Sequence, residues 1–271
     1  MRDELAGATA ALAGAGCETP RLDAELLLAE AAEVDRVALL TGDDSPLSPA
    51  AARRFASLVA RRVGREPVAY ILGRRAFRDV ELIVDPRVLI PRPETELLVE
   101  AALELPEGAR VIDVGTGSGA VALALKHERA DLEVTGSDVS ADALAVARAN
   151  GDRLGLAVTW RRADLLTRAG GPWDAVLANP PYVPDPDLSQ LAPEIRRHEP
   201  PAALSAGEDG LAVIGRLVDQ VAALAVPWVA LEVGLGQAEA VRALLAAAGY
   251  GSTETRADLA GIPRVVVAQR T

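Results

Sequence analysis

The chain is short of the residue types that build disulfides, metal clusters and membrane spans. Cys17 is the only cysteine among 271 residues, and His127 and His198 are the only histidines. One cysteine excludes a disulfide within the chain and a cysteine metal cluster, and two distant histidines do not indicate a metal site. No stretch approaches the ~18 uninterrupted apolar residues that a membrane span requires. The sequence therefore predicts neither a resident metal nor a membrane-spanning segment.

Aromatic residues are also scarce, at 3% of the chain, although apolar residues make up 50%. A sizeable core can be buried, and alanine, valine and leucine must supply most of it. A chain of this length accommodates one large domain, or a small domain followed by a medium one. Asp3 and Glu4 stand where a secretory signal would carry positive charge, so we expect a cytoplasmic protein.

Basic residues are outnumbered by acidic ones, 28 to 39, which gives a net charge of −11. Proteins that bind nucleic acid gain most of their affinity from phosphate contacts and usually present a net basic face. The balance therefore argues against a direct nucleic-acid substrate, although it leaves room for a local basic patch. Arginines concentrate in residues 51–92, which form either a solvated face or a strip that docks an acidic partner.

Hydrophobic spacing divides the chain into three parts. Residues 1–72 carry leucines and valines at near-helical spacing, which predicts a small N-terminal helical bundle. Residues 73–90 alternate apolar and polar side chains, which predicts a β-hairpin linker with its turn at Asp85-Pro86. From residue 91 to 271 strand and helix patterns alternate, as is typical of a mostly parallel sheet with helices on both faces.

Seven segments of the third part are candidate strands. The last two are separated by a loop too short for a crossover helix, so one of them must run antiparallel. The expected fold is therefore α/β, with a seven-stranded Rossmann-like sheet that contains one antiparallel strand. The candidate strands are residues 110–114, 132–137, 157–162, 173–178, 227–233, 250–255 and 264–269.

A glycine-rich turn, DVGTGSGA at residues 113–120, follows the first of these strands and opens a helix. Glycine lets a ligand reach the backbone, and a helix N-terminus offers unpaired N–H groups. Asp138 ends the next strand about 20 residues further on, where a carboxylate can bind ribose hydroxyls. The residues predicted to bind a nucleoside cofactor are Asp113, Gly115, Thr116, Gly117, Ser118, Gly119 and Asp138.

The turn by itself leaves two cofactors open. Gly115, Gly117 and Ala120 also satisfy the nicotinamide fingerprint, so an NAD-dependent oxidoreductase remains an alternative at this point. Asp113 at the strand end would lie near the cationic part of S-adenosylmethionine, and that cofactor needs no phosphate cradle. These two features favour S-adenosylmethionine.

The second motif, Asn179-Pro180-Pro181-Tyr182, directly follows the fourth strand. Ligands of open α/β sheets bind at the carboxyl ends of strands, near the switch in strand order, so the motif should face the cofactor. A planar amide or amino nitrogen is a poor nucleophile because its lone pair is delocalised. The Asn179 side-chain oxygen and the Pro180 carbonyl can accept its two N–H groups, while Tyr182 covers the planar group. The motif predicts methyl transfer governed by positioning, with Asn179, Pro180, Pro181 and Tyr182 as catalytic residues and Asn179 also touching the cofactor.

The pairing of these two motifs resembles methyltransferases that modify planar nitrogens. Further segments make the chain similar to the release factor glutamine methyltransferases, the PrmC/HemK family, over nearly its whole length. The resemblance implies S-adenosylmethionine as cofactor, S-adenosylhomocysteine as product, and N5-methylation of the glutamine in the Gly-Gly-Gln loop of class I peptide chain release factors. The segments that carry it are residues 89–96, 199–204, 207–211, 231–234 with Gln237, and 258–264.

The resemblance also implies roles for regions outside the two motifs. Residues 1–72 would dock the release factor, and residues 91–271 would form the S-adenosylmethionine-dependent methyltransferase domain. Asp164 and Leu165 follow the third strand, where such enzymes contact adenine. Leu165 stands where the family often has an aromatic residue, which weakens the expectation for the adenine contact.

Two other substrates fit the same chemistry. A ribosomal-protein glutamine methyltransferase would use the same two acceptors, the Asn179 oxygen and the Pro180 carbonyl. A DNA or RNA adenine-N6 methyltransferase would act on a similar planar amino group. Glu94 and Glu96 also have two interpretations. They are first-turn acids of a helix at 95–104, stabilised by its dipole, or the loop around Arg92 and Pro93 contacts the methionine end of the cofactor.

Overall fold

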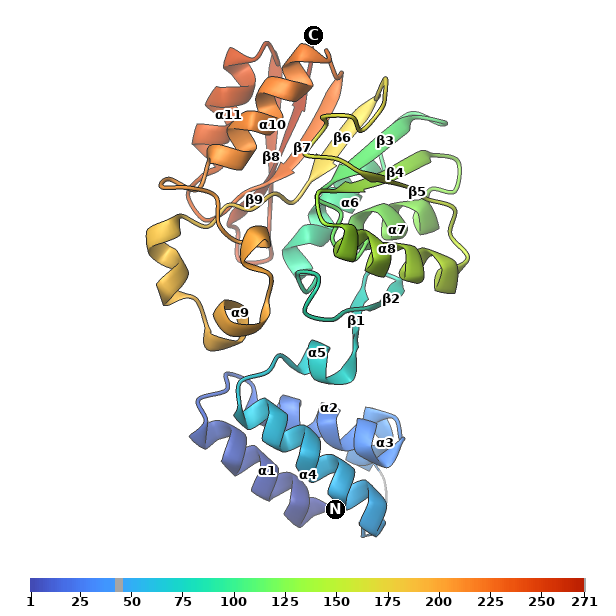
Figure 1. Cartoon of the computed structure of the whole chain (residues 1–271), viewed down its shortest axis with the longest axis vertical. Helices are drawn as coiled ribbons and strands as arrows, with labels where there is room; N and C mark the ends of the chain where they lie inside the picture. Colours follow the sequence, from blue (N-terminus) through green and yellow to red (C-terminus); the bar gives the residue numbers. More distant parts are fainter. Residues whose placement is uncertain (42–45, 271) are drawn as a thin grey trace. The chain divides into compact units, whose positions relative to one another are not determined.

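The computed structural model describes residues 1–41 and 46–270 (Figure 1). The chain divides into two compact units. The helical unit consists of Met1–Arg74 together with Ala192–His198, and the α/β unit consists of Arg75–Leu191 together with Glu199–Thr271. A short segment from late in the sequence, Ala192–His198, thus belongs with the N-terminal helices.

The helical unit is a bundle, as the leucine spacing predicts. α1 packs against α2 and α4, and Leu12, Leu27 and Leu28 are completely buried in its core. Pro20 and Pro49 begin two of the helices, at the position where a missing N–H group costs nothing. The helices of this unit are α1 (Arg2–Gly14), α2 (Pro20–Ala32), α3 (Arg36–Thr41), α4 (Pro49–Val63), α5 (Val68–Leu72) and α9 (Pro193–His198). Among the residues that the structure describes, no helix of either unit is long and apolar enough to cross a bilayer.

A buried cluster of opposite charges ties Ala192–His198 into this unit. The Arg62 side chain is 7% exposed and forms ion pairs of 2.8 Å with both Asp23 and Glu194. Arg65 forms a second ion pair with Glu194, at 2.6 Å. Burial raises the pKa of Glu194, but hydrogen bonds from Arg65 and Arg62 outweigh it and lower the pKa below its ordinary value. These ion pairs therefore tie residues 192–198 to α2 and to the end of α4.

A two-stranded hairpin, β1 (Arg74–Phe77) with β2 (Val80–Ile83), connects the N-terminal helices to the rest of the chain. The predicted hairpin linker is confirmed, but its predicted turn at Asp85-Pro86 is wrong, because the chain turns at Arg78-Asp79. Arg78 adopts a left-handed φ of 47° without glycine or asparagine, so this turn lacks a sequence signal. The strong signal at Asp85-Pro86 marks a separate turn after the hairpin.

The main sheet has seven strands, as predicted, in the order β5-β4-β3-β6-β7-β9-β8. Neighbouring strands from β5 to β7 are parallel, whereas β9 runs antiparallel to both β7 and β8. β9 is therefore the predicted reversed strand. The chain winds outward in both directions from the β3–β6 pair, which places the switch in strand order there. The strands are β3 (Arg110–Val114), β4 (Glu133–Asp138), β5 (Thr159–Arg162), β6 (Ala175–Ala178), β7 (Trp228–Glu232), β8 (Ser252–Ala257) and β9 (Pro263–Gln269).

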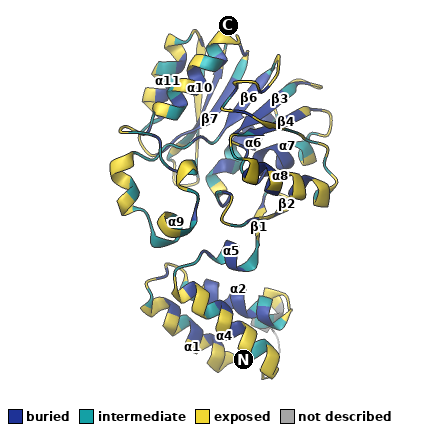
Figure 2. Cartoon of the chain, viewed as in Figure 1, coloured by how far each residue is buried: buried dark blue, intermediate teal, exposed yellow. Residues whose placement is uncertain are grey.

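Helices cover both faces of this sheet (Figure 1). On one face α10 (Ala212–Ala223) and α11 (Ala238–Ala247) enclose an apolar core with the strands. The other face is covered by α6 (Glu96–Ala102), α7 (Ala120–Glu128) and α8 (Ala141–Leu154). The central strands are buried and the helices expose their outer sides (Figure 2), which explains why β6 is a continuous apolar run and why β3 and β7 are mostly apolar. Short 3-10 helices complete the unit: η1 (Pro93–Thr95), η2 (Asp185–Gln190) and η3 (Pro201–Ala203).

A buried asparagine fixes the hairpin and the glycine-rich turn to the same helix. Asn150, on α8, is completely buried. Its Oδ1 accepts a hydrogen bond from the Ile83 N–H at 2.7 Å, and its Nδ2 donates to the carbonyls of Ile83 and Ser118 at 3.0 and 2.9 Å. Three hydrogen bonds from one side chain therefore set the position of β2 against the start of α7.

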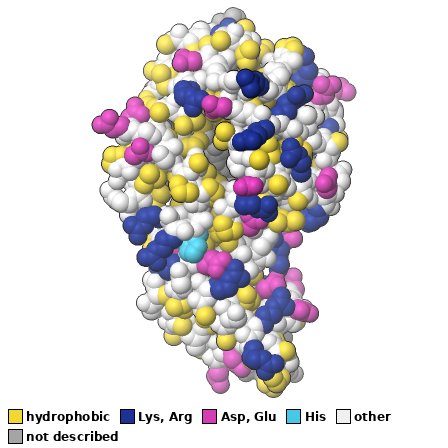
Figure 3. Space-filling model, viewed as in Figure 1, with side chains coloured by type: hydrophobic (Ala, Val, Ile, Leu, Met, Phe, Trp, Pro, Cys, Tyr) yellow, Lys and Arg dark blue, Asp and Glu magenta, His cyan; other side chains and the backbone are white. Residues whose placement is uncertain are grey.

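Most arginines of residues 51–92 face acidic side chains within their own unit. Figure 3 shows the same mixture on the face that it draws, where basic and acidic side chains are interspersed. The pairs are Arg54–Glu30, Arg61–Glu66, Arg62–Asp23, Arg65–Glu194, Arg74–Glu30, Arg78–Glu128, Arg87–Asp85 and Arg92–Glu199. This pairing favours the interpretation of a neutralised surface over a free basic strip.

Candidate active site

The two sequence motifs meet at the carboxyl edge of the sheet. β3 and β6 are paired in parallel with Val114 opposite Ala178, so Gly115 and Asn179 leave the sheet side by side. A Cβ atom built on Gly115 would lie 4.0 Å from the main-chain oxygen of Asn179. The glycine-rich turn and Asn-Pro-Pro-Tyr therefore form two walls of one site, at the switch in strand order where ligands of such sheets bind.

The glycines of the turn are required by its backbone. Gly115, Gly117 and Gly119 have φ values of 74°, 54° and 84°, in the left-handed region that favours glycine. A Cβ atom on Gly119 would also lie 2.9 Å from the indole of Trp160, and one on Gly136 would lie closer still. Trp160 is therefore a packing residue that supports the turn from β5. The result is a turn at the N-terminus of α7 whose glycines carry no side chain over the backbone.

Asp113 shapes this turn from within. Its carboxyl is 2% exposed, and Oδ2 accepts a hydrogen bond from the Thr116 hydroxyl at 2.5 Å. Burial raises the pKa of Asp113 to about 7, opposed by the hydrogen bond from Thr116. The structure thus joins this carboxyl to the turn, and its place near the cationic part of the cofactor stays a prediction. Thr116 and Ser118 are buried as well, and serve the turn through the Asp113 and Asn150 bonds.

Asp138 lies beside the turn at the end of β4. Oδ2 accepts a hydrogen bond from the Gly117 N–H at 3.0 Å, and Oδ1 accepts one from the Ser140 N–H at 2.8 Å. Burial raises its pKa, opposed by these backbone hydrogen bonds. Each carboxylate oxygen keeps lone pairs for a ligand hydroxyl. A glycine-rich turn next to an oriented carboxylate fits a nucleoside cofactor with a free ribose.

The side chain of Asn179 is oriented by a threonine. Nδ2 of Asn179 donates a hydrogen bond to Oγ1 of Thr95 at 3.0 Å. Among the described residues, none donates a hydrogen bond to Oδ1 of Asn179 or to the carbonyl of Pro180. Both acceptors that the sequence analysis assigned to an incoming amide are therefore free to bind one.

The end of the motif is fixed by the loop that follows β7. Nε2 of Gln237 donates to the Tyr182 carbonyl at 3.0 Å, and Oε1 of Gln237 accepts from the Gly234 N–H at 2.9 Å. A Cβ atom on Gly210 would clash with both the Tyr182 carbonyl and Gln237. Burial raises the pKa of Tyr182 to about 12, and the negative charge of Glu232 adds to the effect. Tyr182 therefore remains a neutral phenol whose main chain is fixed by Gln237.

Two of the segments that carry the family resemblance meet beside the motif. The buried carboxylate of Glu199 forms an ion pair with Arg92 at 2.5 Å and accepts a hydrogen bond from the Ile90 N–H at 3.3 Å. Glu96 lies in the first turn of α6, as one of its two interpretations predicts, and accepts a hydrogen bond from the Arg78 N–H at 3.1 Å. These contacts hold the loop that contains Thr95 against Asn179.

Sequence reasoning did not assign two buried polar residues of this site, Thr95 and Glu232. Thr95 is 4% exposed and Glu232, the last residue of β7, is 2% exposed. Both lie in segments that carry the family resemblance, 89–96 and 231–234, and this is the only signal that pointed to them. The pairing of β6 with β7 brings Glu232 to the site, and the hydrogen bond from Asn179 joins Thr95 to it; a linear pattern shows neither contact.

The predicted adenine residues lie after β5 at the edge of the sheet. Asp164 is half-exposed and forms an ion pair with Arg216 at 2.6 Å. Leu165 has a left-handed φ of 53° and packs partly against the apolar core. The structure thus places both residues beyond the carboxyl end of β5, and Asp164 reaches an arginine of α10.

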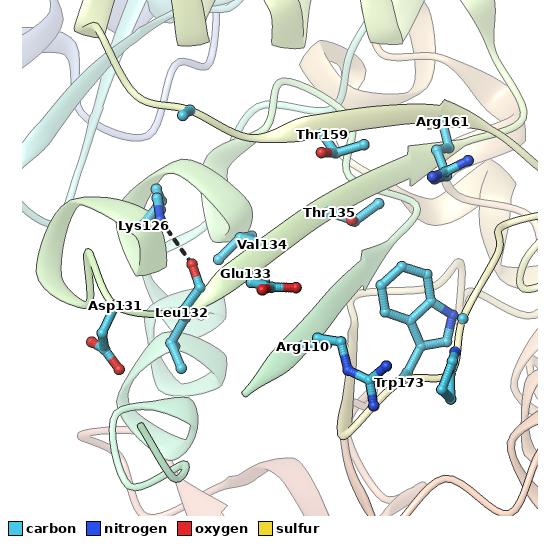
Figure 4. Close-up of a pocket in the computed structure, with 13 residues that line it drawn as sticks. Arg110, Lys126, Asp131, Leu132, Glu133, Val134, Thr135, Thr159, Arg161 and Trp173 are labelled. Atoms are coloured by element: carbon cyan, nitrogen blue, oxygen red, sulfur yellow. Dashed lines mark hydrogen bonds between the residues drawn. The ribbon is translucent and has the colours of Figure 1, made fainter. Parts of the chain in front are cut away.

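A separate cavity of about 450 Å³ opens at the opposite edge of the sheet (Figure 4). Its lining comes from the amino ends of β3, β4 and β5, including Arg110, Glu133 and Thr159. Lys126 points across it and donates to the Leu132 carbonyl at 2.8 Å. Because ligands of open α/β sheets bind at the carboxyl ends, this cavity is not the cofactor site.

Two family models match the chain. One, described as "PrmC N-terminal domain", covers residues 3–73, and the other, "Methyltransferase small domain", covers residues 93–203. Relatives named release factor glutamine methyltransferase match the chain over nearly its full length. The protein from Geobacter sulfurreducens is 41% identical over 259 residues, which cover 94% of this chain and 91% of the relative. The protein from Deinococcus radiodurans is 42% identical over 275 residues, which cover 100% and 98%.

Solved structures share the fold at lower identity. A methyltransferase from Pyrococcus furiosus has a TM-score of 0.56 at 16% identity and covers 79% of this chain and 98% of that chain. The hMettl16 catalytic domain in complex with an RNA hairpin has a TM-score of 0.60 at 16% identity, with 79% and 82% covered. Both comparisons confirm the Rossmann-like methyltransferase fold.

Proposed function

The chain belongs to the release factor glutamine methyltransferase family, and from this premise we propose that it methylates a glutamine side chain of a peptide chain release factor. The enzyme depends on S-adenosylmethionine, as its family does. The proposed acceptor is N5 of the glutamine in the Gly-Gly-Gln loop of class I release factors. The observation that carries the proposal is the free Oδ1 of Asn179 beside the glycine-rich turn.

The proposed mechanism rests on two fixed acceptors. Oδ1 of Asn179 and the carbonyl of Pro180 accept the two N–H groups of the substrate amide. Pro180 and Pro181 fix the backbone, so little conformational entropy is lost when the carbonyl binds. Tyr182 covers the planar amide. The bound cofactor supplies an electrophilic methyl group on a sulfonium, so the protein contributes mainly alignment of the amide nitrogen with that methyl group.

We assign the cofactor to the glycine-rich turn at the start of α7. Gly115, Gly117 and Gly119 expose backbone there, and Asp138 faces the space beside them. The ribose hydroxyls would bind Asp138, and the adenine would lie towards Asp164 and Leu165. Asp113, Thr116 and Ser118 maintain the shape of the turn.

The helical unit is proposed to dock the release factor. Its residues 3–73 match the family model described as "PrmC N-terminal domain", so this part of the chain is shared with the family. Most of its arginines are paired with acidic side chains, which argues against a role as a nucleic-acid surface. We therefore expect the partner to be a protein rather than RNA or DNA.

Mass spectrometry of a release factor after incubation with enzyme and S-adenosylmethionine tests the proposal. We expect one added methyl group on the loop glutamine, and none on a release factor whose loop glutamine is replaced by alanine. Isolated ribosomal proteins and DNA or RNA oligonucleotides, incubated with labelled cofactor, are expected to remain unmodified. Label on one of these substrates with none on the release factor would overturn the assignment.

A further inference from the structure

A buried hydroxyl lies directly behind the proposed clamp. Thr95 Oγ1 accepts the hydrogen bond from Nδ2 of Asn179, and Thr95 is 4% exposed. A hydroxyl group has one proton and two lone pairs. While Thr95 accepts from Asn179, its own proton must therefore be donated to a different group.

Glu232 is the candidate acceptor for this proton. Leu231 is paired with Ala178 in the parallel β6–β7 ladder, so Glu232 and Asn179 are the next residues on neighbouring strands. Glu232 is 2% exposed, and its Oε2 has no hydrogen-bond partner among the described residues. Burial raises the pKa of Glu232 to about 7, while hydrogen bonding with the Thr95 side chain lowers it. A buried carboxyl with spare acceptor capacity thus lies next to a hydroxyl that needs an acceptor.

We propose that Glu232 is a positioning residue for methyl transfer, acting through Thr95 to hold the Asn179 amide with its oxygen towards the substrate. This inference rests on the function proposed above. A carboxylate only accepts hydrogen bonds, so Thr95 must donate to it and must accept from Asn179. Nδ2 of Asn179 is then held on the Thr95 side, and Oδ1 is left for the substrate.

The direction matters because the two ends of an asparagine amide have nearly the same shape and opposite hydrogen-bonding character. In the reversed orientation Asn179 would present an NH₂ group to the NH₂ group of the substrate glutamine. Two donors facing each other leave buried polar groups unpaired, which costs more than the loss of one hydrogen bond. The same arrangement discriminates against a glutamate side chain, since its carboxylate offers the free oxygen of Asn179 no proton.

Protonation of Glu232 weakens its effect on the orientation of the Asn179 amide. A neutral carboxyl carries a proton of its own and can donate to Thr95, which then becomes free to donate to Asn179 and reverse its amide. The groups that act on Glu232 are Glu94, whose charge raises its pKa, and Arg264 and Tyr182, which lower it. The positive charge of Arg92 lowers the pKa of Tyr182, which in turn acts on Glu232. We therefore expect the turnover number of the wild type to fall as the pH drops below about 7.

The first test removes the hydroxyl and keeps its shape. Thr95→Val should lower the turnover number about 10-fold or more, while KM for the release factor and affinity for S-adenosylmethionine stay near wild type. Thr95→Ser should restore activity to within about 3-fold of wild type. The Thr95 side chain makes no capping hydrogen bond with α6, so the valine variant loses no helix cap. Thr135→Val, a buried threonine of β4 outside the site, is the matched control and should retain full activity.

The second test uses the pH profile. Glu232→Gln keeps the size of the side chain and an acceptor oxygen but cannot ionise. Its turnover number at saturating substrate should be reduced and nearly independent of pH between about 6 and 8, whereas the wild type loses activity at the acid end. Asp113, whose pKa is also raised to about 7, is unchanged in this variant and so serves as an internal control.

The outcomes separate the two proposals. A wild type that leaves the release factor unmethylated contradicts the proposed function. An active wild type with a Thr95→Val variant of equal turnover contradicts only the role of the hydroxyl relay, as does an acid limb that persists in Glu232→Gln. If Glu232→Gln does not fold by circular dichroism, the valine and serine variants at position 95 still decide.

Discussion

Buried carboxyl groups are treated differently in the two units. In the helical unit Asp23 and Glu194 each form an ion pair with the guanidinium of Arg62. Beside the candidate site Asp113 and Glu232 have hydroxyl groups as hydrogen-bonding neighbours, and burial raises the pKa of each to about 7. Paired charges fix a chain segment, whereas carboxyls near their titration point control the direction of hydrogen bonds. The comparison teaches that burial alone does not mark a functional carboxyl, because its partner decides the role.

The largest effect is expected from breaking the paired cluster. Arg62→Met leaves the buried carboxylate of Asp23 without its ion-pair partner, while Glu194 keeps Arg65, and should lower the free energy of unfolding by about 3–5 kcal/mol. Urea unfolding followed by circular dichroism measures this loss. Arg54→Met, which removes a more exposed ion pair with Glu30, should cost less than about 1 kcal/mol. Equal losses in both variants would remove the distinction between the buried cluster and surface pairs.

The next effect concerns the clamp in the other unit. Asn179→Ala should reduce turnover by roughly 100-fold or more, because the substrate amide loses its fixed acceptor. Affinity for S-adenosylmethionine, measured by calorimetry, should be largely retained, and the free energy of unfolding should change little. Wild-type turnover in this variant would contradict the proposed mechanism.

Removal of the carboxylate beside the turn should act on cofactor binding instead. Asp138→Ala should weaken S-adenosylmethionine binding by about 1–3 kcal/mol, since a charge-assisted hydrogen bond to the ribose is lost. Calorimetric titration measures the change. Asp131→Ala, at the opposite edge of the sheet, should bind the cofactor as the wild type does. Unaltered affinity in Asp138→Ala would show that the ribose lies elsewhere.

The titration of Asp113 gives a pH-dependent difference in stability. Burial raises its pKa from 3.8 to about 7, so the folded state holds a proton that the unfolded state releases. The contribution of Asp113 to stability is complete below its unfolded pKa and is lost as the pH rises through the folded one. Relative to Asp113→Asn, the wild type should lose up to about 1.4 kcal/mol per pH unit between about pH 4 and 7. Parallel unfolding curves across this range would contradict the raised pKa.

The smallest effect is expected at an exposed pair. Asp164 and Arg216 expose 55% and 54% of their side chains. Asp164→Asn should therefore change the free energy of unfolding by less than about 1 kcal/mol, as chemical denaturation will show. A larger loss would mean that surface pairs of the α/β unit matter as much as the buried cluster of the helical unit.

The sheet was predictable because its strands carry strong local signals. β6 is a continuous apolar run, β3 and β7 are mostly apolar, and the short connection between β8 and β9 requires one reversed strand. The place where Gly115 meets Asn179 also follows from the sequence, since both motifs end neighbouring parallel strands.

The remaining features depend on contacts between distant residues. The hairpin turn at Arg78-Asp79 puts arginine, not glycine or asparagine, at its left-handed position, so the pattern favoured the Asp-Pro dipeptide instead. Nothing in residues 192–198 indicates that Glu194 pairs with Arg62 and Arg65, about 130 positions earlier in the chain. Glu232 looks like the polar end of a buried strand until the pairing of β6 with β7 places it beside the clamp. Ion pairs and buried relays have no periodicity, and a linear reading has no means to find them.

The contact between Trp160 and its glycines has a consequence for how this enzyme can diverge. One indole fills the space that side chains at 119 and 136 would need, and it also lies near Gly151. These positions share a fixed volume, so a larger residue at 136 is tolerated only with a smaller ring at 160. Related sequences should therefore exchange bulk between β4 and β5 in compensating pairs, and the shape of the glycine-rich turn is inherited in part from an outer strand of the sheet.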